Sequence, residues 1–204
     1  MTIWTVFTGD IVNSTALETA ALDAIFDGLG AATRLIGGWQ DRPAPFARFR
    51  GDGWQMAMPP QYTFRALMCL RAAVRAQGKG YDTRIGIGVG AGDLSENDLS
   101  RAEGDAFFAS GRALDAMSRS VRMSAPEGPL ALRAALPLAD RIAQGWTQRQ
   151  AEVMQGLIVP GVATQAEIAR NLGISRQMAQ RHADAASAEA ILEVCALLEA
   201  SNVN

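Results

Sequence analysis

The sequence of 204 residues predicts a mixed α+β fold followed by an all-α region. Strand-like and helix-like stretches alternate through the first half of the chain. The stretch RIGIGVGAG, residues 84–92, alternates apolar residues with glycine, which is typical of a strand. Beyond the sequence PEGP, residues 126–129, strand character is almost absent. We therefore expect two domains, residues 1–125 and 126–204.

The sequence of the first domain predicts strands and helices in the order β-α-β-β-α-β-α. The expected strands are residues 3–7, 46–50, 54–58 and 84–92, and the expected helices are about 16–37, 64–74 and 107–117. Gly51-Asp52-Gly53 separates the second and third strands and is a hairpin signal. The first six elements follow the split βαβ order of ferredoxin-like folds.

The fourth strand has an unusual face. Gly86, Gly88 and Gly90 alternate with the apolar residues and should all point to the same side of the sheet. A strand with glycine along one face lets another backbone, or a ligand, come close.

The second domain is expected to begin with helices around 130–144 and 147–158, followed by the tighter pattern TQAEIARNLGISRQ, residues 164–177. Thr164 with Glu167 forms a capping-box pattern, Gly173 suits a left-handed turn, and Ser175 can cap the next helix. This is the logic of a helix-turn-helix, and the stretch resembles bacterial helix-turn-helix regulators.

The second of these helices would carry the DNA contacts. The residues expected to reach bases or phosphates are Ser175, Arg176, Gln177, Gln180 and Arg181. From residue 146 onward the chain holds four arginines and six acidic residues, which is poor for binding phosphates, although residues 175–183 hold two arginines and no acid. DNA binding and a structural or dimerising use of this helical unit therefore both stay open, and a dimer would favour DNA binding.

The composition of the sequence limits which binding partners and which cellular compartment we expect. A net charge of -2 provides no global basic field for nucleic acid or membranes. Cys69 and Cys195 lie far apart in apolar helical patterns, so we expect buried thiols in a reducing cytoplasm. The N-terminus reads as a strand, not a signal peptide, and no apolar run approaches the roughly 20 residues of a membrane span. Because His182 is the single histidine of the sequence, a metal site with several histidines from one chain is excluded.

Two carboxylates fall at ends of expected strands. Asp10 follows the first strand, and Asp52 lies in the hairpin between the second and third. In a split βαβ sheet these strands are neighbours, so the two side chains can converge. Close carboxylates repel unless a positive charge lies between them, and Mg²⁺ or Mn²⁺ prefers such oxygen ligands. Taken singly, each residue would be ordinary turn chemistry.

Three stretches, FTGDIVNST, FRGDGWQMAM and RIGIGVGAGDL, resemble the signatures of class III nucleotidyl cyclases. The resemblance covers roughly residues 3–118 and implies a palm-type domain of the cyclase kind. The chain also resembles SatD-type bacterial proteins, because it combines a cyclase-like domain with a C-terminal helix-turn-helix and contains the sequence GDIVNS.

The resemblance implies specific roles. Asp10 and Asp52 would bind the metal, with the carbonyl of Ile11 as a further ligand. The phosphate-cradling turn would consist of Val12, Asn13, Ser14 and Thr15. Arg48 falls at the base-selecting position and Arg112 at that of the arginine that stabilises charge in the transition state. Phe108 stands where the family has a ribose-orienting asparagine.

These expectations define three hypotheses. The first is a DNA-binding transcriptional regulator whose cyclase-like domain binds a nucleoside triphosphate or related nucleotide and a divalent metal. The second is an active class III-type cyclase, a homodimer whose substrates include a pyrimidine triphosphate as an open alternative, because Arg48 breaks the purine pattern. The third is a structural or protein-interaction role. Mg²⁺ or Mn²⁺, double-stranded DNA and a second copy of the chain are the expected partners, with no membrane.

Overall fold

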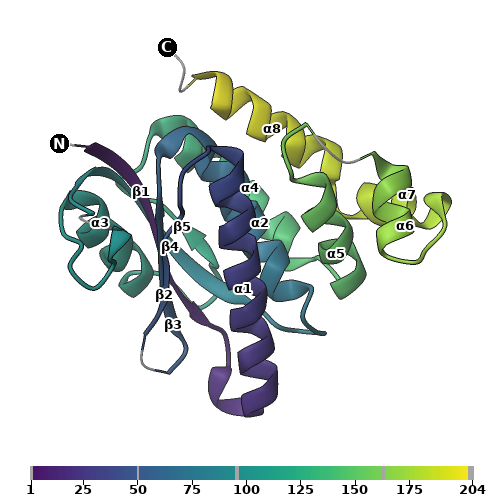
Figure 1. Ribbon diagram of the computed structural model, residues 1–204, viewed down its shortest axis with the longest axis horizontal. Coiled ribbons are helices and arrows are strands. Elements are labelled where there is room, and N and C mark those ends of the chain that lie inside the picture. Colours follow the sequence, from purple (N-terminus) through teal and green to yellow (C-terminus); the bar gives the residue numbers. More distant parts are fainter. Residues whose placement is uncertain (1, 50, 95–96, 162–163, 202–204) are drawn as a thin grey trace.

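The computed structural model describes residues 2–49, 51–94, 97–161 and 164–201 and contains one five-stranded sheet (Figure 1). The strands are β1 Thr2–Ile11, β2 Phe46–Arg48, β3 Gly53–Met58, β4 Thr83–Gly92 and β5 Met123–Ser124. Their order in the sheet is β2-β3-β1-β4-β5, with β1 antiparallel to both β3 and β4. The predicted α+β fold and its βαββαβ order are confirmed.

Helices cover both faces of the sheet and form the whole C-terminal part. They are α1 Thr19–Trp39, α2 Thr63–Arg75, α3 Asp105–Asp115, α4 Leu130–Gln144, α5 Gln148–Leu157, α6 Gln165–Asn171, α7 Arg176–Ala185 and α8 Ala188–Ser201. Figure 1 shows α3 on one side of the sheet and α1 and α2 on the other, with α4 to α8 beyond α2. None of the described helices is both long and apolar enough to cross a membrane.

The alternating burial of β1 divides the core into two layers. Phe7 belongs to the large cluster that the sheet shares with α1, α2 and the C-terminal helices. Val6, one residue earlier, belongs to the smaller cluster under α3. This period of two is what a strand covered on both faces produces. The larger cluster continues into α4 to α8, where Trp146 and Cys195 are buried.

The glycine face of β4 receives the backbone of α3. A Cβ atom at Gly88 would lie 2.0 Å from the carbonyl oxygen of Ala106, and one at Gly86 would lie 2.3 Å from that of Ser110. The helix presents small residues to the strand, since Ala106, Ser110 and Ala113 are buried there. The two alternatives that the sequence left open are thus resolved in favour of a close backbone neighbour.

Most predicted elements are confirmed, with two differences. β1 continues to Ile11, beyond the predicted residue 7, because its polar end pairs with β3 and β4. The sequence analysis missed β5, a strand of two residues that pairs with β4 in parallel. The end of the expected second strand, residue 50, lies outside the described residues.

The C-terminal caps follow the sequence prediction. Thr164 and Glu167 form the capping box of α6, and Gly173 has a φ of 64°. The Ser175 hydroxyl accepts a hydrogen bond from the Met178 amide and caps α7. Each interaction satisfies a backbone group that the helix end leaves without a partner. The predicted pair of short helices with a glycine turn is therefore present.

Candidate functional site

An open pocket of about 560 Å³ lies at the end of β1. It is lined by Asp10, Ile11, Val12, Asn13, Ser14, Thr15, Asp52, Arg84, Arg119 and Arg122. Pairing of β1 with β3 sets Asp10 opposite Gly53, and the amide of Ile11 donates to the carbonyl of Asp52 at 3.2 Å. The hairpin tip is thereby fixed beside the end of β1, so two carboxylates 42 positions apart share one pocket.

The turn after β1 closes one side of this pocket. Asn13 adopts a left-handed conformation, with φ 55°, which asparagine tolerates better than most residues. The amide of Val12 donates to the carbonyl of Asp82 at 2.9 Å, and the hydroxyl of Ser14 donates to the carboxylate of Asp52. The turn therefore orients Asp52 directly.

A cation from the chain itself pairs with one of the two carboxylates, that of Asp10. The Nε atom of Arg84 donates to Oδ1 of Asp10 at 2.9 Å, and a second guanidinium nitrogen donates to Oδ2. The hydrogen bonds to Asp10 raise the pKa of Arg84, against a smaller effect of burial, and the charge of Asp52 raises it further. Asp10 is thus already half of a bidentate ion pair.

The donor set fits a divalent ion in type but is incomplete in number. Carboxylate oxygens of Asp10 and Asp52 are the hard ligands that Mg²⁺ and Mn²⁺ take. Among the described residues no group of three acidic, histidine or cysteine side chains is gathered at one point. An ion here would need oxygens from a bound ligand and would have to displace Arg84 from Asp10.

Arg119 and Arg122 were missed in the sequence analysis. They lie in the segment between α3 and β5 and line the same pocket. Their signal was two arginines three apart just after a predicted helix, but only the pairing of the unforeseen β5 with β4 brings them to this edge of the sheet.

Beneath the pocket lies a buried ionic cluster. It consists of Arg71, Arg75, Asp82 and Asp140. The guanidinium group of Arg71 is fully buried and lies 3.0 Å from Asp82 and 2.9 Å from Asp140. Arg75 lies 3.2 Å from Asp82, and its Nε donates to the carbonyl of Trp146 at 3.0 Å. The cluster ties α2 and the start of β4 to α4.

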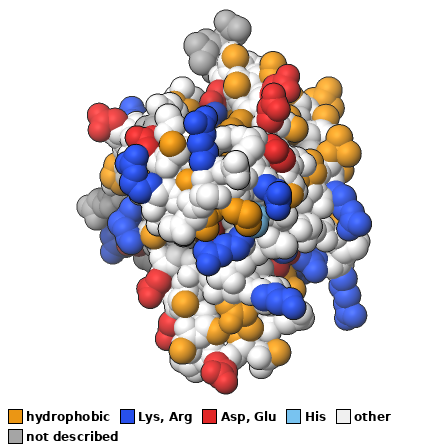
Figure 2. All heavy atoms as spheres, turned by 90° about the vertical axis from the view of Figure 1, so that its right-hand side faces the viewer, with side chains coloured by type: hydrophobic (Ala, Val, Ile, Leu, Met, Phe, Trp, Pro, Cys, Tyr) orange, Lys and Arg blue, Asp and Glu red, His pale blue; other side chains and the backbone are white. Residues whose placement is uncertain are grey.

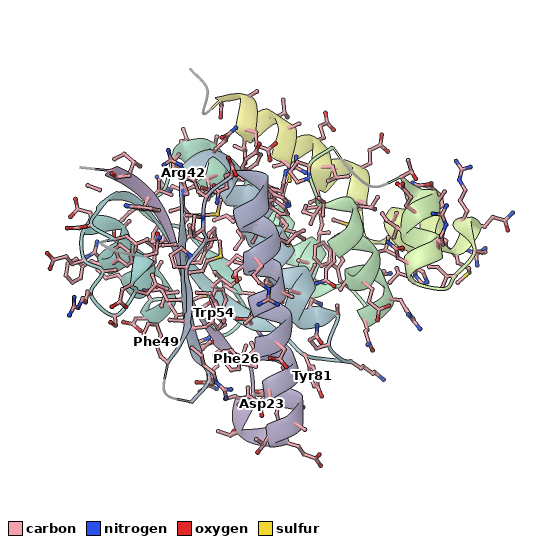
Figure 3. All side chains as sticks on the ribbon, in the orientation of Figure 1. Asp23, Phe26, Arg42, Phe49, Trp54 and Tyr81 are labelled. Atoms are coloured by element: carbon pink, nitrogen blue, oxygen red, sulfur yellow. The ribbon has the colours of Figure 1, made fainter. Side chains whose placement is uncertain are left out.

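Arg48 does not line this pocket. Its guanidinium group pairs with Asp23 of α1 at 2.9 Å and lies 4.0 Å from the centre of the Phe26 ring. Figure 3 shows Asp23 and Phe26 on α1. Within one chain, Arg48 therefore links β2 to α1.

Arg112 also lies outside the pocket. It donates through two guanidinium nitrogens to Glu127, and both side chains are more than half exposed. Phe108, on the same helix, is 65% exposed. Both side chains therefore face solvent on the outer surface of α3.

The five residues expected to contact DNA all lie exposed at or on α7: Ser175, Arg176, Gln177, Gln180 and Arg181. The buried side of the helix consists of Ala179 and Ala183. Gln180 donates to Asp184 at 2.6 Å. Figure 2 shows the side of the molecule on which α6 and α7 lie in Figure 1, with basic side chains scattered over it and acidic ones among them.

Comparisons with known proteins give a likeness of fold only. No protein-family model matches the sequence, and no curated protein matches it. The structure is similar to the guanylate cyclase domain of RhGC from Catenaria anguillulae in complex with GTP, with a TM-score of 0.42, 18% identity and coverage of 57% of this chain and 74% of that chain. It is also similar to the adenylyl cyclase CyaB from P. aeruginosa, with a TM-score of 0.39, 20% identity and coverage of 57% and 72%. At these TM-scores the likeness carries no functional conclusion.

Proposed function

We propose that the protein is a DNA-binding regulator whose sheet domain binds a nucleotide, with Mg²⁺ or Mn²⁺, in the pocket at the end of β1. The observation that carries the DNA-binding part is the outer face of α7. Two arginines and two glutamines there are exposed, while small alanines face inward and a capped glycine turn sets the angle to α6. Side chains of these types read base edges and phosphates.

Nucleotide binding is supported by the chemistry of the pocket. Three arginines and two aspartates line it, so the lining carries one net positive charge. Guanidinium groups pair well with phosphate, and a divalent ion bound by Asp10 and Asp52 would neutralise phosphate oxygens further. Asn13, Ser14 and Thr15 offer additional polar groups from the adjacent turn.

The test begins with selection of duplexes from a randomised DNA library by the full chain, with and without each nucleoside triphosphate and Mn²⁺. The double variant Arg176→Ala, Arg181→Ala should bind selected duplexes more weakly, with a salt dependence reduced by about two phosphate contacts. Arg149→Ala, at an exposed arginine on α5, is the matched control. If no duplex is enriched under any of these conditions, the proposal of a DNA-binding regulator is wrong.

A nucleotidyl cyclase is the second candidate, favoured by the presence of Asp10 and Asp52 in one pocket. In a head-to-tail homodimer, Arg112 of the second copy would be needed at this site, because within one chain it pairs with Glu127 on the outer face of α3. Incubation with Mn²⁺ and each of the four ribonucleoside triphosphates should then yield a cyclic product and pyrophosphate. Asp10→Asn and Asp52→Asn should each abolish it, and no product from any triphosphate would exclude this candidate.

A further inference from the structure

The arginine-bearing wall of the pocket differs from the wall formed by the aspartates. It comes from the segment between α3 and β5, which no motif in the sequence had marked as part of a site. The guanidinium group of Arg119 makes no ion pair with any residue that the structure describes, and its side chain is exposed. It is therefore free to bind an anion in the pocket.

Arg122 makes no hydrogen bond to the carboxylates of the cluster beneath it, although its Nη1 donates to the carbonyls of Arg119 and Val121. Its Nε atom lies 3.6 Å from Oδ2 of Asp82, too far for a hydrogen bond. That nitrogen is buried and has no hydrogen-bond partner among the described residues. A buried donor without a partner costs free energy, and a turn of the side chain that brought this nitrogen to a ligand oxygen would remove that cost.

Charge counting points the same way. Asp82 and Asp140 are two carboxylates shared among three guanidinium groups, those of Arg71, Arg75 and Arg122. Arg71 and Arg75 make the shorter contacts, so the positive charge in excess falls to Arg122 at the pocket wall. One further negative charge in the pocket would balance it.

We propose that Arg119 and Arg122 form a subsite for a diphosphate group, which would hold the distal phosphates of a nucleoside diphosphate or triphosphate. Two guanidinium groups three residues apart suit a ligand with two linked phosphates better than a single carboxylate. As part of a nucleotide site this subsite rests on the proposed function, but its anion chemistry can be measured without a nucleotide or a metal.

The segment that carries the subsite is anchored to the C-terminal helices. The amide of Arg122 donates to Oδ2 of Asp140 in α4 at 2.9 Å, and Nη1 of Arg122 donates to the carbonyl of Val121 at 3.1 Å. The first bond fixes the backbone and the second holds the guanidinium group, so the buried Nε atom reaches a ligand only when the side chain turns. The subsite is therefore built on a fixed support and needs only a side-chain adjustment to accept a ligand.

Titration calorimetry on the full chain tests the proposal, with inorganic pyrophosphate in the absence of divalent ions. Pyrophosphate should bind more tightly than orthophosphate. Arg119→Gln should weaken it about tenfold or more, since a charge-assisted hydrogen bond is lost. Arg101→Gln, an exposed arginine outside the pocket, should bind as the wild type does.

Arg122→Gln should weaken pyrophosphate binding at least as much. If that variant is unstable, exposed Arg119 still decides the question, with an unchanged melting temperature of Arg119→Gln as the check of folding. Wild-type pyrophosphate affinity in folded Arg119→Gln, or no pyrophosphate binding by the wild type, overturns the subsite.

A nucleotide arm separates this outcome from failure of the proposed function. A triphosphate that competes with pyrophosphate, next to a monophosphate that does not, supports the subsite as the place of the distal phosphates. Triphosphate binding that depends on Asp10 but not on Arg119 would leave the proposed function standing and remove the subsite. Pyrophosphate binding that needs Arg119, without any nucleotide binding, would do the reverse.

Discussion

The buried ionic cluster and the open pocket both combine arginines with aspartates, but in different surroundings. The buried cluster has two arginines and two aspartates, whereas the pocket has two aspartates and three arginines, one of which, Arg122, also lies near Asp82 of the cluster. In the buried cluster each carboxylate contacts at least one guanidinium group, and Arg71 is fully buried. At the pocket Arg119 is unpaired within the described chain, and Asp52 is held by a hydroxyl.

The two groups differ in their exposure to solvent, and the pKa values of their arginines differ accordingly. Burial lowers the pKa of Arg75, and the nearby charge of Asp82 offsets part of this effect. At the pocket, hydrogen bonds to Asp10 dominate and raise the pKa of Arg84. A buried charge needs its partners for stability, whereas a charge at an open pocket can exchange its partner for a ligand. Residue type alone therefore does not reveal which arginines are structural.

The largest effect is expected from Asp140→Ala, which breaks the buried cluster. It leaves Arg71 with Asp82 alone and removes the acceptor for the Arg122 amide. We expect the free energy of unfolding to fall by about 3–5 kcal/mol, since a fully buried charge loses one of its two partners. Urea unfolding measures this, with Asp23→Ala, from an exposed pair, as the control. A loss as small as that of the control would show that the cluster is not structural.

The buried thiols extend the comparison to groups that are neutral. Burial raises the pKa of Cys69 and of Cys195 to about 12, from an ordinary value of 9.0. Above pH 9 the unfolded chain loses thiol protons that the folded chain keeps, so stability should fall as pH rises from 9 to 12. Each thiol contributes at most about 1.4 kcal/mol per pH unit.

The measurement is urea unfolding at several alkaline pH values, for the wild type and for Cys69→Ala, Cys195→Ala. The double variant should be less stable at neutral pH but lose less as the pH rises. Equal losses in both proteins would mean that the thiols ionise alike in the folded and unfolded chains.

A smaller change in stability and a gain in ion binding are expected from Arg84→Gln. The pair with Asp10 is partly exposed, with 34% of the Arg84 side chain accessible, so its loss should cost about 1 kcal/mol or less. Freed of Arg84, Asp10 and Asp52 should bind Mn²⁺ about tenfold more tightly. Mn²⁺-dependent melting shifts report this gain, and adding Asp10→Asn should remove it. Unchanged Mn²⁺ affinity would mean that Arg84 does not compete with the ion.

The smallest effect is expected at the exposed pair of Arg112 and Glu127. Its hydrogen bonds lower the pKa of Glu127, but both side chains lie in water. Glu127→Gln should leave the melting temperature unchanged at low and high salt, because exposed ion pairs contribute little. A clear drop in the melting temperature of Glu127→Gln at low salt would show that this pair, like the buried cluster, stabilises the fold.

Local patterns predicted the fold well because they reflect local physics. The glycine alternation at residues 84–92 identified β4, and the capping signals at Thr164 and Ser175 located α6 and α7. The strand order then brought Asp10 and Asp52 to one pocket. By contrast, the pairing of Arg84 with Asp10 could not be predicted, since it depends on the register between β1 and β4.

The arginine wall was missed for a related reason. Arg119 and Arg122 reach the pocket only because two residues, Met123 and Ser124, pair with β4 in parallel. A strand of two residues leaves no periodicity to detect. The buried cluster was equally invisible, because charged residues such as Arg71 in a helix are normally exposed and only tertiary packing buries them.

Trp146 lies between α4 and α5 and makes hydrogen bonds to both α2 and the end of α7. Its carbonyl accepts from Arg75 of α2, and its ring nitrogen donates to the carbonyl of Ala186 at the end of α7, at 2.9 Å. The side chain is 2% exposed. With the other three of the four tryptophans replaced by phenylalanine, indole fluorescence would serve as a built-in optical probe of this junction. The titration of a candidate effector could then be followed by the fluorescence of Trp146, without an attached dye.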